Sequence, residues 1–597
     1  MPKRPHPPPA RRKKTPKAPE TADEYLAVAV DLEESGERWR SGDVAKAGRF
    51  FVQAITAYEN TLVRYPNNFD ARYNRARLLY TLTQLPLPPT FFPATSTPET
   101  RLLAAAEAHK ECNELEKDSS DILFNYGQTL SSVGEFYANK PQDSDDDNNN
   151  GNGGGDVQDE ETTTREIERL QQSKQAFEAS WGIFQQCLAV QEAEYKSTLE
   201  QSQSFDNFDG EDAMNDGAIV SQNGNGNGEE YQEEDGGIKL PERRSSVASS
   251  HSSNSGSGGN NTTQWASIVE PTTKLSILDT ALAMLEVQTS ILTLSTPSTA
   301  AAIFPPTTEY IPQITTHAAS ILDSYILPIA RALHEETDLG LEPAEIAERR
   351  VEAVLSRANF LVALAETRFY LGLQTAEGWE EEVKAAFEPF HLISPSSTTH
   401  GTDNTTITSG DKIPENGLII DLTTSWMALC DRSTARTTLS TTLSPTNPPK
   451  AWKLATTSSS DLASATKLAP DKEKPGIYLA RGNLELLRSR IIGVEAAEKG
   501  RGVLRKNAGV YYRGVVTAAG SSLIGAVDGV KVAEAVQEAR VKEAVVKLED
   551  GMDAGLKTLV KGGIGKVAVW RTIKAAVEEG IFGRETLGAV EGVLRGI

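Results

Sequence analysis

The chain has 597 residues, too many for one hydrophobic core, which predicts several folded units or one elongated repeat array. Only 38% of the residues are hydrophobic and 7% are aromatic, so we expect part of the chain to be unfolded. The net charge of −23 argues against general nucleic-acid binding, and three scattered cysteines exclude a disulfide framework and fit a reducing compartment.

The chain opens on a basic head, residues 1–17, in which no signal peptide is recognised. The head carries seven Lys or Arg and no acid, and its prolines favour an extended chain. Such a segment is typical of a nuclear-localisation signal or a nucleic-acid patch. Because the whole chain is acidic, we favour a nuclear address over an accidental basic tail, and we expect the protein in nucleus and cytoplasm. No later run approaches 18 apolar residues, so no membrane span is expected.

Beyond the head, Ala-, Leu- and Glu-rich segments at helical spacing dominate and no stretch alternates as a strand does, which predicts an all-α fold. A Gly-Asp turn at residues 42–43 is followed by Ala47, Phe51 and Ala54 on one helix face. Small residues let two paired helices approach each other, and the aromatic ring fills the space between them. This second helix should end before Pro66, which cannot continue it.

A second helix pair repeats the pattern. Its first helix has Asn74 and Ala76 at the polar and small positions, and its second helix carries Ala105, His109 and Cys112 at the triplet positions. His109 therefore takes the place of the aromatic ring. We interpret it as a core residue rather than a metal ligand, because no second His or Cys lies at the spacing of a metal site.

A third pair is interrupted by an acidic insert, residues 141–164, which should loop outward because the two helices still need each other. Gly127 takes the contact position of the first helix, and the triplet returns as Ser180, Phe184 and Cys187. A second acidic tract covers residues 200–235. The two tracts carry eight and eleven acids, no base and few apolar residues, so both should be disordered. They serve either as solvated linkers or as an acidic shield that attracts a basic partner.

Helical spacing resumes after the second tract. One apolar stripe consists of Leu275, Leu278, Leu282 and Leu285. Residues 343–372 begin at a proline suited to a first helical turn, and Leu364, Ala365 and Gly372 fit positions 7, 8 and 15 of the repeat. Residues 460–515 show a further helix end and helix start, and the remaining chain is expected to form a helical cap.

Together these patterns resemble the tetratricopeptide-repeat superfamily, whose helix pairs stack into a right-handed solenoid. The resemblance is good for residues 22–195 and weaker for 343–372 and 460–515. We therefore predict an all-α, tetratricopeptide-like right-handed helical solenoid with acidic disordered inserts. The predicted division is a basic disordered tail (1–20), repeats (21–195, with the insert 141–164), an acidic and Ser-rich disordered linker (196–264), helical repeats (265–394), a disordered linker (395–413), repeat-like helices (414–515) and a helical cap (516–597).

In that superfamily the first helix of each pair lines a concave groove that binds partner peptides. By register, the resemblance implies a groove made of Trp39, Arg40, Tyr73, Asn74, Arg77, Tyr80, Asn125 and Gln128. The lysines and arginines with which chaperone-binding members hold a terminal carboxylate are missing, so heat-shock-chaperone tails are not the expected ligand. Tyr73 and Tyr80 have an equally good interpretation as packing residues between helices.

No motif predicts catalysis, and we expect no cofactor and no metal. The run Lys561–Lys566 suggests a phosphate loop but lacks the first glycine, the hydroxyl residue after the lysine and a preceding strand. The seven histidines form no metal-binding pair. Two arginines precede Ser245 and Ser246, which fits either a kinase site or an accidental match.

The leading hypothesis is a non-enzymatic scaffold that binds partner proteins, and more sharply an assembly or escort chaperone for a basic client such as a histone or a ribosomal protein. The alternative is a regulatory adaptor subunit of a larger complex, in which the acidic tracts only link. An enzyme whose site forms only in three dimensions is the third and weakest hypothesis. We expect protein partners, and neither direct nucleic-acid nor membrane binding.

Overall fold

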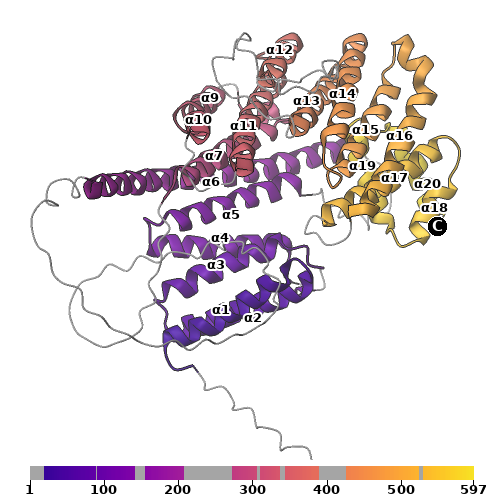
Figure 1. Ribbon diagram of the computed structural model, residues 1–597. Helices are drawn as coiled ribbons and strands as arrows, with labels where there is room; N and C mark the ends of the chain where they lie inside the picture. Colours follow the sequence, from indigo (N-terminus) through magenta and orange to yellow (C-terminus); the bar gives the residue numbers. More distant parts are fainter. Residues whose placement is uncertain are drawn as a thin grey trace, which may run out of the picture.

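The computed structural model describes residues 19–88, 91–93, 95–140, 155–206, 272–305, 309–335, 343–388, 425–522 and 529–596. Throughout these ranges the regular structure is helical and no strand occurs, which confirms the all-α prediction. The helices stack side by side from the indigo N-terminal pairs to the yellow C-terminal helices (Figure 1). The basic head, the predicted linker 395–413, the serines Ser245 and Ser246, and most of both acidic tracts lie outside the described residues.

The first six helices form three antiparallel pairs. They are α1 (Ala22–Arg40), α2 (Val44–Arg64), α3 (Phe69–Gln84), α4 (Pro98–Leu115), α5 (Ser120–Asn139) and α6 (Gly155–Asp206). Local signals set their ends: Thr21 caps α1 in a reciprocal capping box with Glu24, and the Asp43 carboxylate accepts a hydrogen bond from the amide of Lys46 at 2.9 Å. Helix α2 ends two residues before Pro66, as its sequence predicts.

The middle of the chain is less regular. Its elements are α7 (Lys274–Thr293), α8 (Ala300–Ile303), α9 (Tyr310–Ile321), the π-helix η2 (Leu322–Ile326), α10 (Leu327–Glu335), α11 (Pro343–Tyr370) and α12 (Ala376–Ala386). The segments α9, η2 and α10 follow one another without a break and pack on α7. They therefore take the place of the second helix beside α7.

The C-terminal part returns to long helices and ends in shorter ones. They are α13 (Ser425–Leu443), α14 (Pro448–Leu468), α15 (Lys474–Arg490), α16 (Glu495–Ser522), α17 (Gly529–Glu549), α18 (Ala554–Lys561), α19 (Lys566–Glu578) and α20 (Arg584–Arg595). The glycine-rich run that suggested a phosphate loop is the turn between α18 and α19, where Gly563 has a φ of +104°. No strand leads into it, so the structural context of a phosphate loop is absent there.

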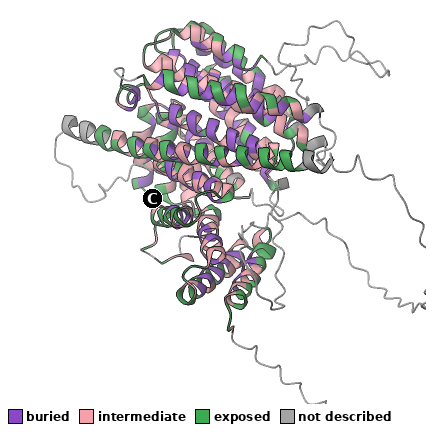
Figure 2. Ribbon diagram, turned by 90° about the vertical axis from the view of Figure 1, so that its left-hand side faces the viewer, coloured by how far each residue is buried: buried purple, intermediate pink, exposed green. Residues whose placement is uncertain are grey.

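The helices form two rows. We call α1, α3, α5, α7, α11, α13, α15 and α17 the first-helix row. From α3 onward each of its helices contacts the next, and each row member also packs on the partner helix that follows it in sequence. The largest apolar cluster continues from Leu170 on α6 to Ala497 on α16, which shows that the core extends along the stack instead of closing around a centre. Buried positions lie on the helix sides that face neighbours (Figure 2).

Glycines facing aromatic rings set the closest helix–helix approaches. A Cβ atom added to Gly127 on α5 would lie 2.7 Å from the ring of Phe184 on α6, and one added to Gly36 on α1 would lie 2.4 Å from Phe51 on α2. The same relation joins Gly482 on α15 to the ring of Tyr512 on α16, at 2.5 Å. These contacts, in three of the pairs, confirm the predicted contact position of Gly127. The predicted triplets of all three N-terminal pairs are buried: Ala47, Phe51, Ala54, Ala105, His109, Cys112, Ser180, Phe184 and Cys187.

Two sequence predictions are corrected. Helix α6 runs over 52 residues, so residues 155–164 and 196–206, which we expected to be disordered, are helical. The first stretch places acids at the start of a helix, where negative charge is favourable, and the second contains no Gly or Pro to stop the helix. Gly372 lies beyond the end of α11 with a φ of +71°, so it terminates that helix.

Candidate partner-binding surface

The predicted groove residues lie on α1, α3 and α5, three consecutive members of the first-helix row (Figure 1). The structure brings several of them together but engages most of their polar groups internally. The Asn125 amide donates to the Tyr73 hydroxyl at 2.8 Å, and the hydroxyls of Tyr80 and Ser132 lie 2.9 Å apart. Tyr73 is buried, and burial raises its pKa above the ordinary value. Tyr73 and Asn125 therefore connect α3 to α5.

Arg77 is engaged in the same way. Its guanidinium forms an ion pair with Glu33 on α1, whose other carboxylate oxygen accepts a hydrogen bond from the Tyr58 hydroxyl on α2 at 2.8 Å. Burial, with the adjacent Glu33 carboxylate, raises the pKa of Tyr58 well above its usual range. The three side chains thus link α1, α2 and α3, so Arg77 is largely committed to holding the first two pairs together.

The remaining predicted residues are still accessible. Trp39 is exposed at the end of α1 with the Lys46 ammonium 3.1 Å from its ring centre, and Arg40 pairs with Glu37 at 3.4 Å. Asn74 and Gln128 are half-buried, and within the described part of the chain their amides make no hydrogen bond. Of the eight predicted residues, these two amides are the best placed to bind a peptide backbone.

A line of carboxylates further along the row was not predicted from the sequence. Glu135 on α5, Glu286 on α7 and Glu352 on α11 follow one another on three successive helices of the row. Burial raises the pKa of Glu135, and the charge of Glu286 raises it further; burial and then Glu352 raise the pKa of Glu286. Each side chain reaches solvent, but the neighbouring helices withdraw part of it from water.

Cations do not balance this line evenly. Arg349 pairs with Glu352 at 2.9 Å and with Asp279 at 3.2 Å, so the α11 end is partly neutralised. Glu135 and Glu286 form no ion pair with any residue in the described ranges. We call Glu135, Glu286 and Glu352 the acidic line. One sequence signal was available: Asp279 and Glu286, the two acids of α7, are seven residues apart, which places both on one face.

A small hollow adjoins the Glu135 end of the acidic line. It has a volume of about 320 Å3 and lies between the ends of α3 and α5 and the start of α4, with the ring of Phe136 in its wall. Lys140 and Arg101 also line it, but Lys140 pairs with Glu99 at 2.9 Å, and Arg101 donates to the Ser96 carbonyl and stacks on Phe92. An aromatic wall beside a carboxylate suits the apolar stem and charged end of a lysine or arginine.

The described residues contain no cluster of three or more His, Cys, Asp or Glu side chains able to hold a metal ion. His109 is fully buried, and neither ring nitrogen has a hydrogen-bond partner. Burial, assisted by the charge of Arg77, lowers its pKa to about 4. His109 is thus a neutral packing residue, as its place in the triplet predicts.

Helix α7 is the one helix among the described residues that is long and apolar enough to cross a membrane by length and composition. Within the fold 61% of its apolar window is buried, against α6, α11 and the α9–α10 segment. The apolar character of α7 is therefore explained by its place between neighbouring helices.

No protein-family model matches the chain. Two curated fungal proteins are similar to parts of it. UPF0656 protein C926.02 of Schizosaccharomyces pombe is 35% identical over 129 residues, which cover 21% of this chain and 27% of that protein. The uncharacterized protein YNL193W of Saccharomyces cerevisiae is 34% identical over 64 residues, 11% of this chain and 12% of that protein. The chain thus matches only about a quarter and an eighth of these relatives' length, and their names state no function.

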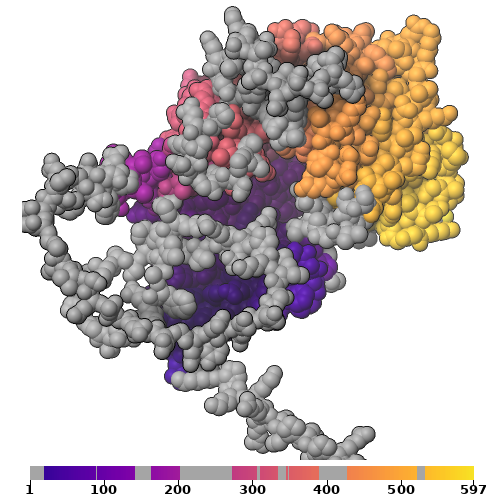
Figure 3. Space-filling view, in the orientation of Figure 1, coloured from indigo at the N-terminus to yellow at the C-terminus, as the bar shows by residue number. Residues whose placement is uncertain are grey.

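Among solved structures, a circular tandem repeat protein with novel repeat topology and enhanced subunit contact surfaces aligns with 96% of this chain and 95% of its own. The identity is 9% and the TM-score 0.25, a likeness too distant to bear on fold or function. The description as stacked helix pairs rests on the packing itself. In the space-filling view the indigo N-terminal pairs and the yellow C-terminal helices occupy different ends of the molecule (Figure 3).

Proposed function

We propose that the protein is a non-enzymatic helical-repeat scaffold that escorts a basic client, a histone or a ribosomal protein, and that the client's lysines and arginines bind along the acidic line. The observation that carries this proposal is the pair Glu135 and Glu286, two like charges on adjacent row helices with no ion pair to a described cation. Like charges held close together cost free energy unless a cation joins them. A basic segment would supply that cation.

Further features support the proposal. Three of the helix pairs carry a small residue against an aromatic ring, as tetratricopeptide repeats do. We infer that the stack is a right-handed solenoid of that type, whose row of first helices receives partner segments. The acidic tracts would raise the local concentration of a cationic client through long-range attraction. The basic head would direct the protein to the nucleus, from a pool shared with the cytoplasm.

The test is the double substitution Glu135→Gln and Glu286→Gln, assayed by binding of a Lys- and Arg-rich histone-tail peptide across a salt series. We expect about tenfold weaker binding at low salt, since each lost contact between partly desolvated charges contributes roughly 0.5–1 kcal/mol. The melting temperature should rise at the same time, because the substitutions remove repulsion between α5 and α7.

A matched control is the pair Glu107→Gln and Glu114→Gln on α4, which changes the net charge equally at exposed positions outside the first-helix row. If both double variants weaken binding alike, only net charge matters and the acidic line is not the site. If the unmodified protein binds no basic peptide at low salt, the chaperone role fails and an adaptor role takes its place.

A further inference from the structure

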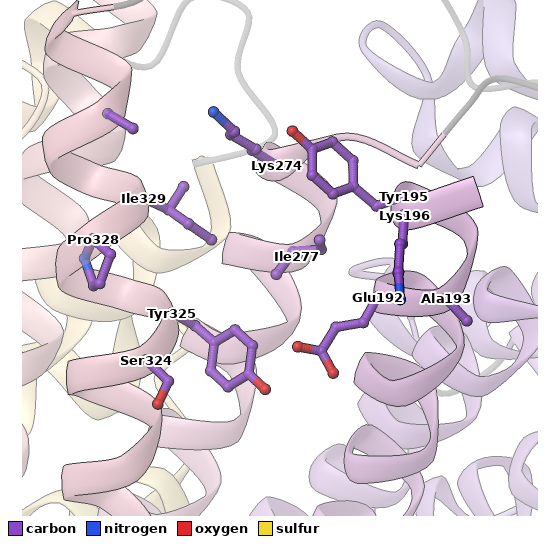
Figure 4. A pocket seen from close by; sticks show the side chains of 11 residues that line it. Glu192, Ala193, Tyr195, Lys196, Lys274, Ile277, Ser324, Tyr325, Pro328 and Ile329 are labelled. Carbon is purple, nitrogen blue, oxygen red and sulfur yellow. The ribbon is translucent and has the colours of Figure 1, made fainter. Parts of the chain in front are cut away.

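A second hollow lies away from the acidic line, between α6, α7 and the η2–α10 segment, with a volume of about 610 Å3 (Figure 4). Its wall is mostly apolar and includes Ile277, Pro328, Ile329 and Ala332. Tyr325 comes from the π-helix and hydrogen-bonds the Glu192 carboxylate on α6, and both side chains point toward each other in the close-up. The hollow therefore offers an apolar interior with charged residues at its rim.

Lys196 is the rim residue that bears on a ligand. It is exposed on α6, lines the hollow and makes no ion pair with any residue in the described ranges. Tyr195 lies next to it on the same wall. A cation and a tyrosine beside an apolar interior suit a segment that presents large apolar side chains together with one carboxylate.

The chain itself supplies such a segment at this place. Helices α6 and α7, which form two walls of the hollow, are joined through residues 207–271. Thr272, the first described residue after this segment, is held on α6, because its hydroxyl donates a hydrogen bond to the Glu194 carboxylate. The same carboxylate accepts a hydrogen bond from the Ser120 hydroxyl at 3.2 Å. Lys274, two residues after Thr272 in the chain, lines the hollow. The described chain therefore resumes at Thr272, close to the rim of the hollow.

The residues just before Thr272 differ in composition from the tract that precedes them. Residues 207–263 are rich in Asp, Glu, Asn, Gly and Ser, whereas Trp265, Ile268 and Val269 are apolar and are followed by Glu270. Six residues of extended chain span roughly 20 Å, enough to cross a hollow of this size. A segment tethered this closely also binds at a high effective concentration.

We propose that residues 265–270 bind in the hollow of the same chain, with the apolar side chains in the interior and Glu270 at Lys196. The occupied hollow would fix the start of α7 against α6 and hold one end of the acidic tract at the body of the protein. This inference concerns a different surface from the acidic line and does not depend on the proposed function.

The test is the rate of chymotrypsin cleavage after Trp265, measured by mass spectrometry and normalised to cleavage after Tyr231 in the same molecules. We expect cleavage of the intact protein to be at least tenfold slower than that of a free peptide of residues 260–273. Ala332→Glu, which places a charge in the interior, should restore fast cleavage. Val63→Glu on α2, a site 81% exposed, should leave it slow.

A charge exchange separates binding from loss of fold. Lys196→Glu alters an exposed residue and should accelerate cleavage, and adding Glu270→Lys in the same chain should slow it again. Fast cleavage in the unaltered protein overturns the proposal and leaves the hollow for another occupant, such as a partner chain or a second copy. Slow cleavage that persists in Ala332→Glu and in Lys196→Glu also overturns it, because the segment would then be protected elsewhere.

Discussion

Single polar residues in this protein divide into those engaged by a neighbouring helix and those left available. Tyr73, Arg77 and Asn125 have the residue types of a peptide-binding groove, but the structure uses their polar groups to join α1, α3 and α5. Among the described residues, the amides of Asn74 and Gln128 have no hydrogen-bond partner, and Glu135 and Glu286 have no ion-pair partner. The difference follows from tertiary neighbours, since a buried donor or acceptor needs a partner and takes the nearest one.

His109 gives a prediction about pH. Its pKa is lowered from the ordinary value of 6.5 to about 4 in the folded chain, so protonation favours unfolding. The free energy of unfolding should therefore be independent of His109 protonation above pH 6.5. It should fall as the pH drops toward 4, by an amount on the order of 3 kcal/mol. Urea unfolding of the protein and of His109→Phe across this range measures it. The variant should show the shallower pH dependence, and parallel curves would contradict the assignment.

Gly127 gives a prediction about packing. In Gly127→Leu the new side chain meets the Phe184 ring, which a Cβ atom alone would already approach to 2.7 Å. Overpacking of this kind costs about 1–3 kcal/mol, so the melting temperature should fall clearly. Gly182→Leu on α6 is the control, because nothing lies within 4 Å of a Cβ atom there, and it should keep or raise the melting temperature. An unchanged midpoint for Gly127→Leu would mean that α5 and α6 separate at little cost.

At the scale of elements, the α5–α6 pair shows how two helices pack in a fixed register although residues 141–154 separate them in the chain. Gly127 and Gly134 on α5 face Phe184 and Phe177 on α6, so the contact repeats after seven residues, two helical turns. The same interval separates Ser180 and Ser173, whose hydroxyls donate to the carbonyls of Gly127 and Gly134, each at 2.7 Å. The described helices on both sides of residues 141–154 therefore hold their register by side-chain contacts.

Removing the two serine hydroxyls should weaken the pair without opening a large cavity. Each hydrogen bond contributes roughly 1 kcal/mol net, so Ser173→Ala with Ser180→Ala should lower the free energy of unfolding by about 2 kcal/mol. The two effects should be nearly additive, because the sites are about 10 Å apart. Denaturant unfolding of the two single variants and the double variant tests this. Thr198→Ala, an exposed position on the same helix, should change the stability little. Marked non-additivity would show that α6 shifts as a unit.

At the scale of the whole molecule, stability comes from a stack in which each pair contacts mainly its neighbours. Such a stack tolerates insertions between or within pairs, provided that the facing helices remain intact. This explains how a chain with long acidic tracts retains a continuous core from α6 to α16. It also limits where the tracts can be removed, because α6 extends into both of them.

A deletion restricted to residues 141–154 and 207–235 should leave the fold intact and weaken binding of a basic client. It removes thirteen carboxylates but none of the described helices. The lost attraction should be largest at low salt, since the screening length shrinks from about 10 Å at 0.1 M to about 3 Å at 1 M. Circular dichroism checks the fold, and histone binding across a salt series checks the client. Equal histone binding by the full-length protein and the deletion variant would show that the acidic tracts act only as linkers.

Much less of the candidate surface than of the fold was predictable from the sequence. Register within a helix pair identified α1, α3 and α5 as the row, whereas the spacing of Asp279 and Glu286 was a signal of a polar face on α7 that the sequence prediction did not use. The sequence does not reveal that the charge of Glu286 acts on Glu135, because these residues are distant in the chain and become neighbours only when the third pair stacks on the fourth. The second hollow was equally hidden, since it needs α6, α7 and the η2–α10 segment at once.

The sequence by itself determined the helical class, the helix ends at Thr21, Asp43 and Pro66, and the small–aromatic contacts of the α1–α2 and α5–α6 pairs. These are local properties, set by capping groups, by proline and by the 3.6-residue period of one helix facing its immediate partner. The tertiary structure decided the length of α6, the side chains engaged between pairs and the carboxylates left without a cation. Those outcomes depend on how successive pairs stack, and stacking is fixed by the combined shape of many side chains that no single stretch of sequence contains.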